Sequence, residues 1–116
     1  MLIKLLKSKI HRAVVTDANL DYEGSIAIDS DLMKSAKIQN YEKVHVLDIT
    51  NGARLETYAI PDTPGSKSIC INGAAAHLIK TGDRVIILSY CTLDKSKSNN
   101  HKPKIIRLNH KNHITS

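Results

Sequence analysis

The stretch KVHVLDITNGARLETYAI, residues 43–60, contains two runs of strand-forming residues joined by Asn51-Gly52. Apolar and polar residues alternate along the first run, as expected of a strand with one buried face. Asn-Gly between two such runs is the strongest short signal for a β-hairpin, because both residues tolerate positive φ angles. The sequence therefore predicts antiparallel strands over about residues 43–50 and 54–60.

Four further strands and two short helices are predicted around this hairpin. The strands are IHRAVVT at 10–16, which starts at or before Lys9, IAID at 26–29, KSICI at 67–71 and RVIILSYCTL at 84–93. The helices are DLMKSAKI at 31–38, with Asp29 or Ser30 as N-cap, and NGAAAHLI at 72–79. Six closely spaced strands with only brief helices favour a closed β-barrel, which leaves no exposed sheet edge.

Composition indicates which residues can form the core and where in the cell the protein is expected. The chain has 116 residues and neither Phe nor Trp, so one core built from Ile, Leu, Val and Ala is expected. Lysines interrupt the apolar residues of the N-terminus, which is unlike a secretory signal, and no run of about 18 apolar residues could span a membrane. We therefore expect a cytoplasmic protein. Cys70 and Cys91 lack CxxC spacing and are expected to be buried, reduced thiols, a redox or nucleophilic role being the alternative.

The net charge of +6 comes entirely from the C-terminal segment. Residues 1–94 contain 11 Lys or Arg and 11 Asp or Glu, whereas residues 95–116 contain six basic residues and no acid. This segment is polar and low in hydrophobic residues, so we expect a mobile, basic tail, solubilising by default, with a weak strand over 105–108. The charge also keeps open a second interpretation, a small basic β-barrel that binds DNA without catalysis.

The stretch YEGSIAID at 22–29 points to chemistry only as part of a longer pattern. A Gly-Ser pair alone usually makes a turn. Together with KIHRAVVT at 9–16, TNGARLETYAI at 50–60 and NGAAAH at 72–77, however, this stretch resembles the pyruvoyl-dependent aspartate 1-decarboxylase family in order and in spacing. The resemblance covers about residues 3–93, and its four blocks in register make it specific. It implies a six-stranded double-psi β-barrel over residues 1–94, with the tail outside the resemblance.

By this resemblance, the chain cuts itself between Gly24 and Ser25. The Ser25 hydroxyl attacks the Gly24 carbonyl carbon, and elimination and hydrolysis then leave a pyruvoyl group at position 25. Gly24 lacks a Cβ, which frees its backbone angles and leaves its carbonyl open to attack. Backbone strain could contribute ~1–3 kcal/mol, but positioning of the hydroxyl could contribute roughly 7–11 kcal/mol, so positioning should dominate. The resemblance assigns to Thr57 the hydrogen bond that polarises the Gly24 carbonyl.

The same resemblance implies that the pyruvoyl ketone replaces pyridoxal phosphate in converting L-aspartate to β-alanine for pantothenate synthesis. Lys9 and Arg54 occupy the positions that hold the substrate carboxylates in the family, although which cation takes which carboxylate stays open. Tyr58 would protonate the α-carbon. Arg54 and Tyr58, four residues apart on a strand, share a face, which agrees independently with these roles. Thr57 has the opposite parity, so its role needs a bulge, a bend or a neighbouring subunit.

Further positions match the family's pocket, although each could instead serve ordinary packing. They are His11, Tyr22, Asn72, the backbone at Gly73, Ala74 and Ala75, and Ile86 as an apolar wall. The tail histidines lack metal-ligand spacing, so no metal is expected. Ile26 departs from the Cys or Thr that the family often carries there, which could change the cleavage rate.

The family assembles as homotetramers with active sites at subunit interfaces, and this is expected here by resemblance alone. No nucleic-acid or membrane partner is expected of such an enzyme. Whether self-cleavage is spontaneous or needs a maturation factor stays open.

Overall fold

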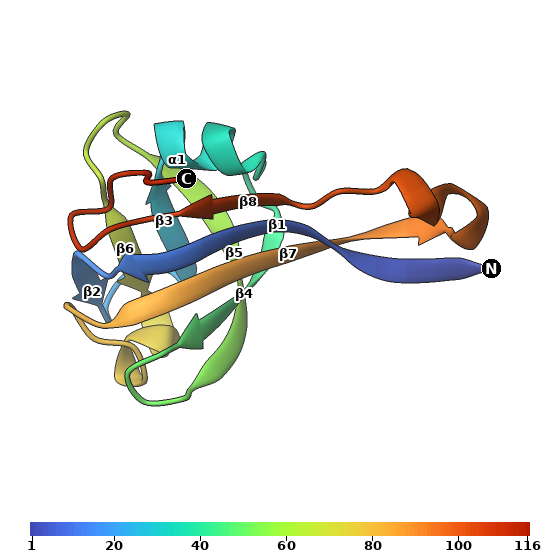
Figure 1. Ribbon diagram of the computed structural model, residues 1–116. Helices are drawn as coiled ribbons and strands as arrows, with labels where there is room; N and C mark the ends of the chain where they lie inside the picture. Colours follow the sequence, from blue (N-terminus) through green and yellow to red (C-terminus); the bar gives the residue numbers. More distant parts are fainter.

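The computed structural model describes residues 1–116, in which eight strands form one sheet in the order β2-β6-β3-β5-β4-β7-β1-β8 (Figure 1). The strands are β1 (Leu2–Val14), β2 (Asp17–Asn19), β3 (Ser25–Asp29), β4 (Lys43–Asp48), β5 (Arg54–Asp62), β6 (Ile69–Asn72), β7 (Arg84–Asp94) and β8 (Lys104–Arg107). One α-helix, α1 (Ser30–Ala36), and two 3₁₀ helices, η1 (Gly73–His77) and η2 (Lys95–Asn100), complete the chain. The mainly β class is confirmed. Beyond the six predicted strands, the structure has the short β2, which was not predicted, and the C-terminal β8, where only a weak strand was expected.

The hairpin at the centre of the sequence forms as predicted. β4 and β5 pair antiparallel without interruption, from Lys43 opposite Tyr58 to Leu47 opposite Arg54. The turn between them places Gly52 at φ +79°, and the Asp48 carboxylate accepts the Thr50 N–H at 2.7 Å. Local turn chemistry therefore determines the register of the two strands.

The long strands β1 and β7 give the molecule its elongated shape, with extents of 44 × 28 × 24 Å. They pair antiparallel from Leu2 opposite Asp94 to Val14 opposite Arg84, with two register shifts. Figure 1 shows their ends projecting from the body as a two-stranded arm, with the N-terminus and η2 at its tip. Beside the arm, the rest of the sheet curls around the core.

Aliphatic side chains build the core, as the composition predicted, with Met33 as an additional member. Its fully buried members include Ile10, Ile26, Ile28, Val44, Val46, Ile69, Ile71, Val85 and Ile87, which come from five different strands. β-branched residues of this kind pack well on a pleated sheet. Ile26, the position at which the sequence departs from the family, faces this core and is fully buried.

The C-terminal segment differs from the mobile tail that the sequence predicted. β8 pairs in parallel with β1 over Ser8 to His11, which confirms the weak strand expected there. Ile106, Leu108 and Asn112 are buried. The Asn112 side chain accepts the Val14 N–H at 2.7 Å and donates to the Val14 carbonyl at 2.9 Å. Residues 95–116 thus pack against the sheet and contribute to the core, and the expected boundary at residue 94 does not end the folded chain.

Neither cysteine is disulfide-bonded. Both are half-buried rather than fully buried as predicted. Burial raises the pKa of the Cys70 thiol and so favours its protonated form. No helix has the length and apolar character needed to cross a membrane.

The start of α1 is fixed by Asp29, the last residue of β3. Its carboxylate accepts N–H groups from Asp31 at 2.8 Å, from Lys67 at 2.8 Å and from Gly65 at 3.1 Å. Burial disfavours the charged form of this carboxyl, but these donors outweigh burial and lower its pKa. Asp29 therefore joins β3, the helix and the loop before β6.

Asp29→Asn should lower the free energy of unfolding by about 1–3 kcal/mol at neutral pH, because a buried charged acceptor of three N–H groups is lost. A lowered pKa in the folded state stabilises the fold above the unfolded pKa of about 4, and this stabilisation is lost as the pH falls through the folded value. The difference between variant and parent should therefore shrink in acid.

Urea unfolding at several pH values measures this effect, on chains that also carry Ser25→Ala so that the expected cleavage does not intervene. The exposed Asp21 provides the matched control. Asp21→Asn should leave the free energy of unfolding at neutral pH nearly unchanged, because its side chain is exposed. A deficit of Asp29→Asn that is constant from pH 7 to pH 3 would contradict the role of the charge.

Candidate active site

The residues singled out in the sequence separate into two groups on opposite faces of the sheet. Those around Ser25 lie where β3, β5, β6 and η1 meet. The others lie on the outward face formed by β1, β7, β4 and β5, and this face is called the outer face below.

Ser25 is the first residue of β3 and is only 3% exposed. It lies opposite Asn72 in the antiparallel pairing of β3 with β6. The Asn72 amide donates to the Ser25 hydroxyl oxygen at 3.1 Å, and the hydroxyl donates to the Glu23 carbonyl at 3.4 Å. The hydroxyl is therefore held from both sides, next to the peptide bond that precedes it.

Gly73 packs directly against the Gly24-Ser25 segment. Its φ is +78°, and a Cβ at this position would lie 2.7 Å from the Gly24 Cα and 2.9 Å from the Gly24 nitrogen. Gly24 itself has no positive φ, and a Cβ there would meet no atom within 4 Å. In this conformation, the steric need for glycine therefore lies at Gly73, whereas the sequence placed it at Gly24.

A cavity of about 340 Å³ opens beside this segment. Five of the predicted site residues line it, namely Gly24, Thr57, Asn72, Ala74 and Ala75. Leu55, Glu56 and Leu78 complete its wall and were not predicted. Tyr22 does not line the cavity and is 63% exposed.

The other predicted residues share the outer face. In β5, Arg54 and Tyr58 are exposed, while Thr57 is half-buried and points to the opposite face. Lys9 of β1 lies opposite Leu88 of β7. Ile86 of β7 lies opposite Leu47 of β4, and Leu47 in turn lies opposite Arg54 of β5. Residues paired in this way point to the same face of a sheet. His11 belongs to the same face because it follows Lys9 by two residues.

The parity predicted from the sequence is thus confirmed. Of the three explanations left open for Thr57, a bulge between Arg54 and Tyr58 is excluded, because the β4–β5 register is continuous there. Within one chain, Thr57 lies with Gly24, while Arg54 and Tyr58 face the other way.

His11 lies among cations without a neighbouring acid. Burial lowers the pKa of its imidazole, and the charges of Lys9, Arg12, Arg107 and Arg84 lower it further. The neutral form is therefore favoured at pH 7. Its Nδ1 atom is buried without a hydrogen-bond partner.

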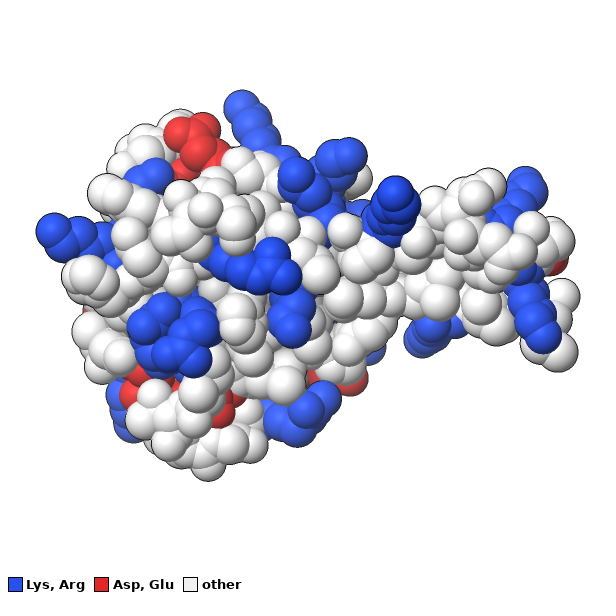
Figure 2. All heavy atoms as spheres, in the orientation of Figure 1, with Lys and Arg blue, Asp and Glu red and all other residues white.

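Figure 2, drawn in the orientation of Figure 1, shows Lys and Arg side chains over the region of β8, β1 and β7. An anionic ligand would experience an attractive field on this face.

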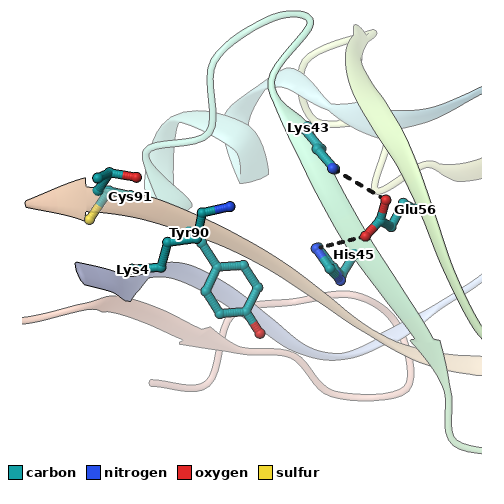
Figure 3. Close-up of a pocket in the computed structure, with 7 residues that line it drawn as sticks. Lys4, Lys43, His45, Glu56, Tyr90 and Cys91 are labelled. Atoms are coloured by element: carbon teal, nitrogen blue, oxygen red, sulfur yellow. Dashed lines mark ion pairs between the residues drawn. The ribbon is translucent and has the colours of Figure 1, made fainter. Parts of the chain in front are cut away.

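The outer face also has a hollow of about 450 Å³, lined by Lys4, Lys43, His45, Glu56, Tyr90, Cys91 and Thr92 (Figure 3). In it, the Glu56 carboxylate forms an ion pair with Lys43 at 3.2 Å and lies 3.5 Å from the Nε2 atom of His45. The rings of His45 and Tyr90 form a T-shaped pair, with 5.2 Å between ring centroids. None of these residues belongs to the site predicted from the sequence, and only Cys91 was considered there, as a buried thiol. Glu56 lies two residues from both Arg54 and Tyr58, so the two-residue period of a strand predicts that it shares their face.

Known proteins match nearly the whole length of this chain. Residues 1–115 match the family described as Aspartate decarboxylase. An aspartate 1-decarboxylase of Clostridium kluyveri is 55% identical over 98% of this chain and 90% of its own length. The enzyme of that name from Caldicellulosiruptor bescii is 54% identical over 98% and 89%.

A third relative with this name, from Thermoanaerobacter pseudethanolicus, is 56% identical over 93% of this chain and 92% of its own length. The family match includes residues 95–115, which the sequence analysis had placed outside the resemblance, and so agrees with the packing of β8. The chain belongs to the aspartate decarboxylase family.

Proposed function

We propose that the protein decarboxylates L-aspartate to β-alanine and CO2, after cutting itself between Gly24 and Ser25 to form a pyruvoyl group. The observation that carries the proposal is a buried serine hydroxyl, held by Asn72 and Glu23, beside a peptide segment packed on Gly73. Full-length relatives named aspartate 1-decarboxylase support the substrate and the reaction. Supply of β-alanine for pantothenate synthesis follows from that reaction.

Self-cleavage would begin with attack of the Ser25 oxygen on the Gly24 carbonyl carbon. The C–O bond forms, the C–N bond breaks, and the hydroxyl proton ends on the freed nitrogen. Thr57, which lines the same cavity as Gly24, would polarise the carbonyl. Loss of the Ser25 α-proton then expels the Gly24 carboxylate, and water releases ammonia to leave the ketone. Residues 1–24 and 25–116 become separate chains.

The surroundings of Ser25 fit the pyruvoyl group that the family implies. The cavity beside Gly24 has about 340 Å³ and small walls at Ala74 and Ala75, which leave room for a substrate of the size of aspartate. When formed, the ketone would supply the electron sink for loss of CO2. The Asn72 amide, which lies 3.1 Å from the Ser25 oxygen and also lines the cavity, would orient the group beside it.

The outer face would supply the charges for binding aspartate. Lys9 and Arg54 would hold its two carboxylates, and Tyr58 would deliver a proton to the α-carbon. His11 and Ile86 would line the same region. Because Arg54 and Tyr58 point away from the cavity beside Gly24 within one chain, a complete site requires the outer face of a neighbouring subunit. A homotetramer of double-psi β-barrels with interface sites provides this arrangement.

A cytoplasmic location fits such an enzyme. The proposed cleavage chemistry is the same whether or not an accessory maturation factor accelerates it. Incubation of purified chain alone would measure the unassisted rate.

Reductive trapping tests the proposed cofactor. Borohydride added with labelled L-aspartate should attach the label covalently to the fragment 25–116, at its first residue, and should inactivate the enzyme. Peptide mapping by mass spectrometry locates the label. Active protein that takes up no label under these conditions would overturn the pyruvoyl proposal.

Arg54→Ala should leave self-cleavage intact and lower kcat/KM for aspartate roughly 10- to 150-fold, because a charge-assisted hydrogen bond to a carboxylate contributes about 1.5–3 kcal/mol. Steady-state kinetics of β-alanine formation measure the effect. Lys34→Met, which removes an exposed cation from α1, is the control and should change little. Normal kinetics of Arg54→Ala would remove this residue from the site.

A further inference from the structure

Glu56 occupies a position that conflicts with anion binding by its neighbour. It lies between Arg54 and Tyr58 on the exposed side of β5. Residues two apart on a strand point the same way and are about 7 Å apart, so a free glutamate could reach the Arg54 guanidinium. A carboxylate paired there would compete directly with a substrate carboxylate.

The structure shows that Glu56 is held elsewhere. One carboxylate oxygen lies 3.2 Å from the Lys43 ammonium, and the other lies 3.5 Å from His45 Nε2. Figure 3 shows Glu56 turned toward these two side chains of β4. The ring of His45 also packs against Tyr90. Arg54 takes part in no ion pair, although it lines a shallow pocket together with His45 and Glu56.

We infer that Lys43 and His45 form a clamp that keeps the Glu56 carboxylate off Arg54, so that the guanidinium stays available for the substrate carboxylate. The inference rests on the proposed function of Arg54. Lys43 and His45 act here as positioning residues, since neither needs to touch substrate. The Lys43 ammonium also balances the negative charge of Glu56, which would otherwise repel a dianionic substrate.

The double variant Lys43→Met/His45→Gln releases Glu56 and tests the clamp. KM for aspartate should rise about two- to fivefold, the size expected of exposed ion pairs. Because the clamp acts on binding, kcat and the rate of self-cleavage should stay unchanged. The rise in KM should shrink at about 1 M salt, where exposed charges are screened.

A rescue separates this role from general damage to the fold. Adding Glu56→Gln to the double variant should restore KM, because no carboxylate then competes for Arg54. Lys34→Met controls for the loss of one surface charge. An unchanged KM in the double variant, or a raised KM that Glu56→Gln does not restore, would overturn the clamp.

Arg54→Ala distinguishes failure of the clamp from failure of the proposed function. Normal kinetics in Arg54→Ala would refute the binding role of that residue. If Arg54→Ala lowers kcat/KM but the double variant Lys43→Met/His45→Gln leaves KM unchanged, the clamp is refuted and the binding role of Arg54 stands.

Discussion

Ser25→Ala is expected to abolish both chain cleavage and β-alanine formation while leaving the fold intact. Alanine lacks the hydroxyl that attacks the Gly24 carbonyl and the oxygen that later leaves as part of the Gly24 carboxylate, so no ketone can form. Cleavage is followed by intact-mass spectrometry, β-alanine by a product assay, and the fold by circular dichroism.

A buried serine elsewhere provides the matched control. Ser89 is 1% exposed and its hydroxyl has no hydrogen-bond partner. Ser89→Ala should therefore cleave and turn over normally. β-Alanine production by Ser25→Ala above the background of the preparation would show that the electrophile lies elsewhere.

Gly73→Ala should slow self-cleavage by on the order of 10²-fold. The new Cβ would lie 2.7 Å from the Gly24 Cα, and no flexible side chain is available to give way, so the backbone of the scissile segment must shift. A misplacement of about 1 Å can cost an intramolecular reaction this factor. The fraction of cut chain over time after purification measures the rate.

Gly65 separates this steric effect from the cost of a positive φ. Its φ is also +78°, but a Cβ there would meet no atom within 4 Å. Gly65→Ala should lose about 1–2 kcal/mol of stability through the left-handed backbone and still cleave at the parent rate. Equal cleavage rates in the two variants would contradict the role of Gly73.

Features set by neighbouring residues could be predicted from the sequence. The β4–β5 hairpin followed from Asn51-Gly52 and from alternation, because turn and strands are contiguous in the chain. The opposite parity of Thr57 and Tyr58 followed from the two-residue period of a strand and holds in the structure. The aliphatic core followed from the absence of Phe and Trp.

Features that depend on contacts between distant residues could not be predicted from local pattern. The contact of Gly73 with Gly24 joins positions 49 apart in the numbering, and Asn112 anchors Val14 across 98 positions. Composition suggested a mobile tail because its charge is visible in the sequence, whereas the burial of Ile106 and Asn112 is not. Likewise, only the pairing of β1, β7, β4 and β5 brings Lys9 and Ile86 onto the same face as Arg54.

The most direct measurement is the intact mass of active, purified protein under denaturing conditions. We expect two species, residues 1–24 ending in a carboxylate and residues 25–116 beginning with a ketone in place of the serine amine and hydroxyl, so that the larger chain has no free amino terminus. A single unbroken chain with full activity, or a larger fragment that begins with an unmodified serine, would contradict the account.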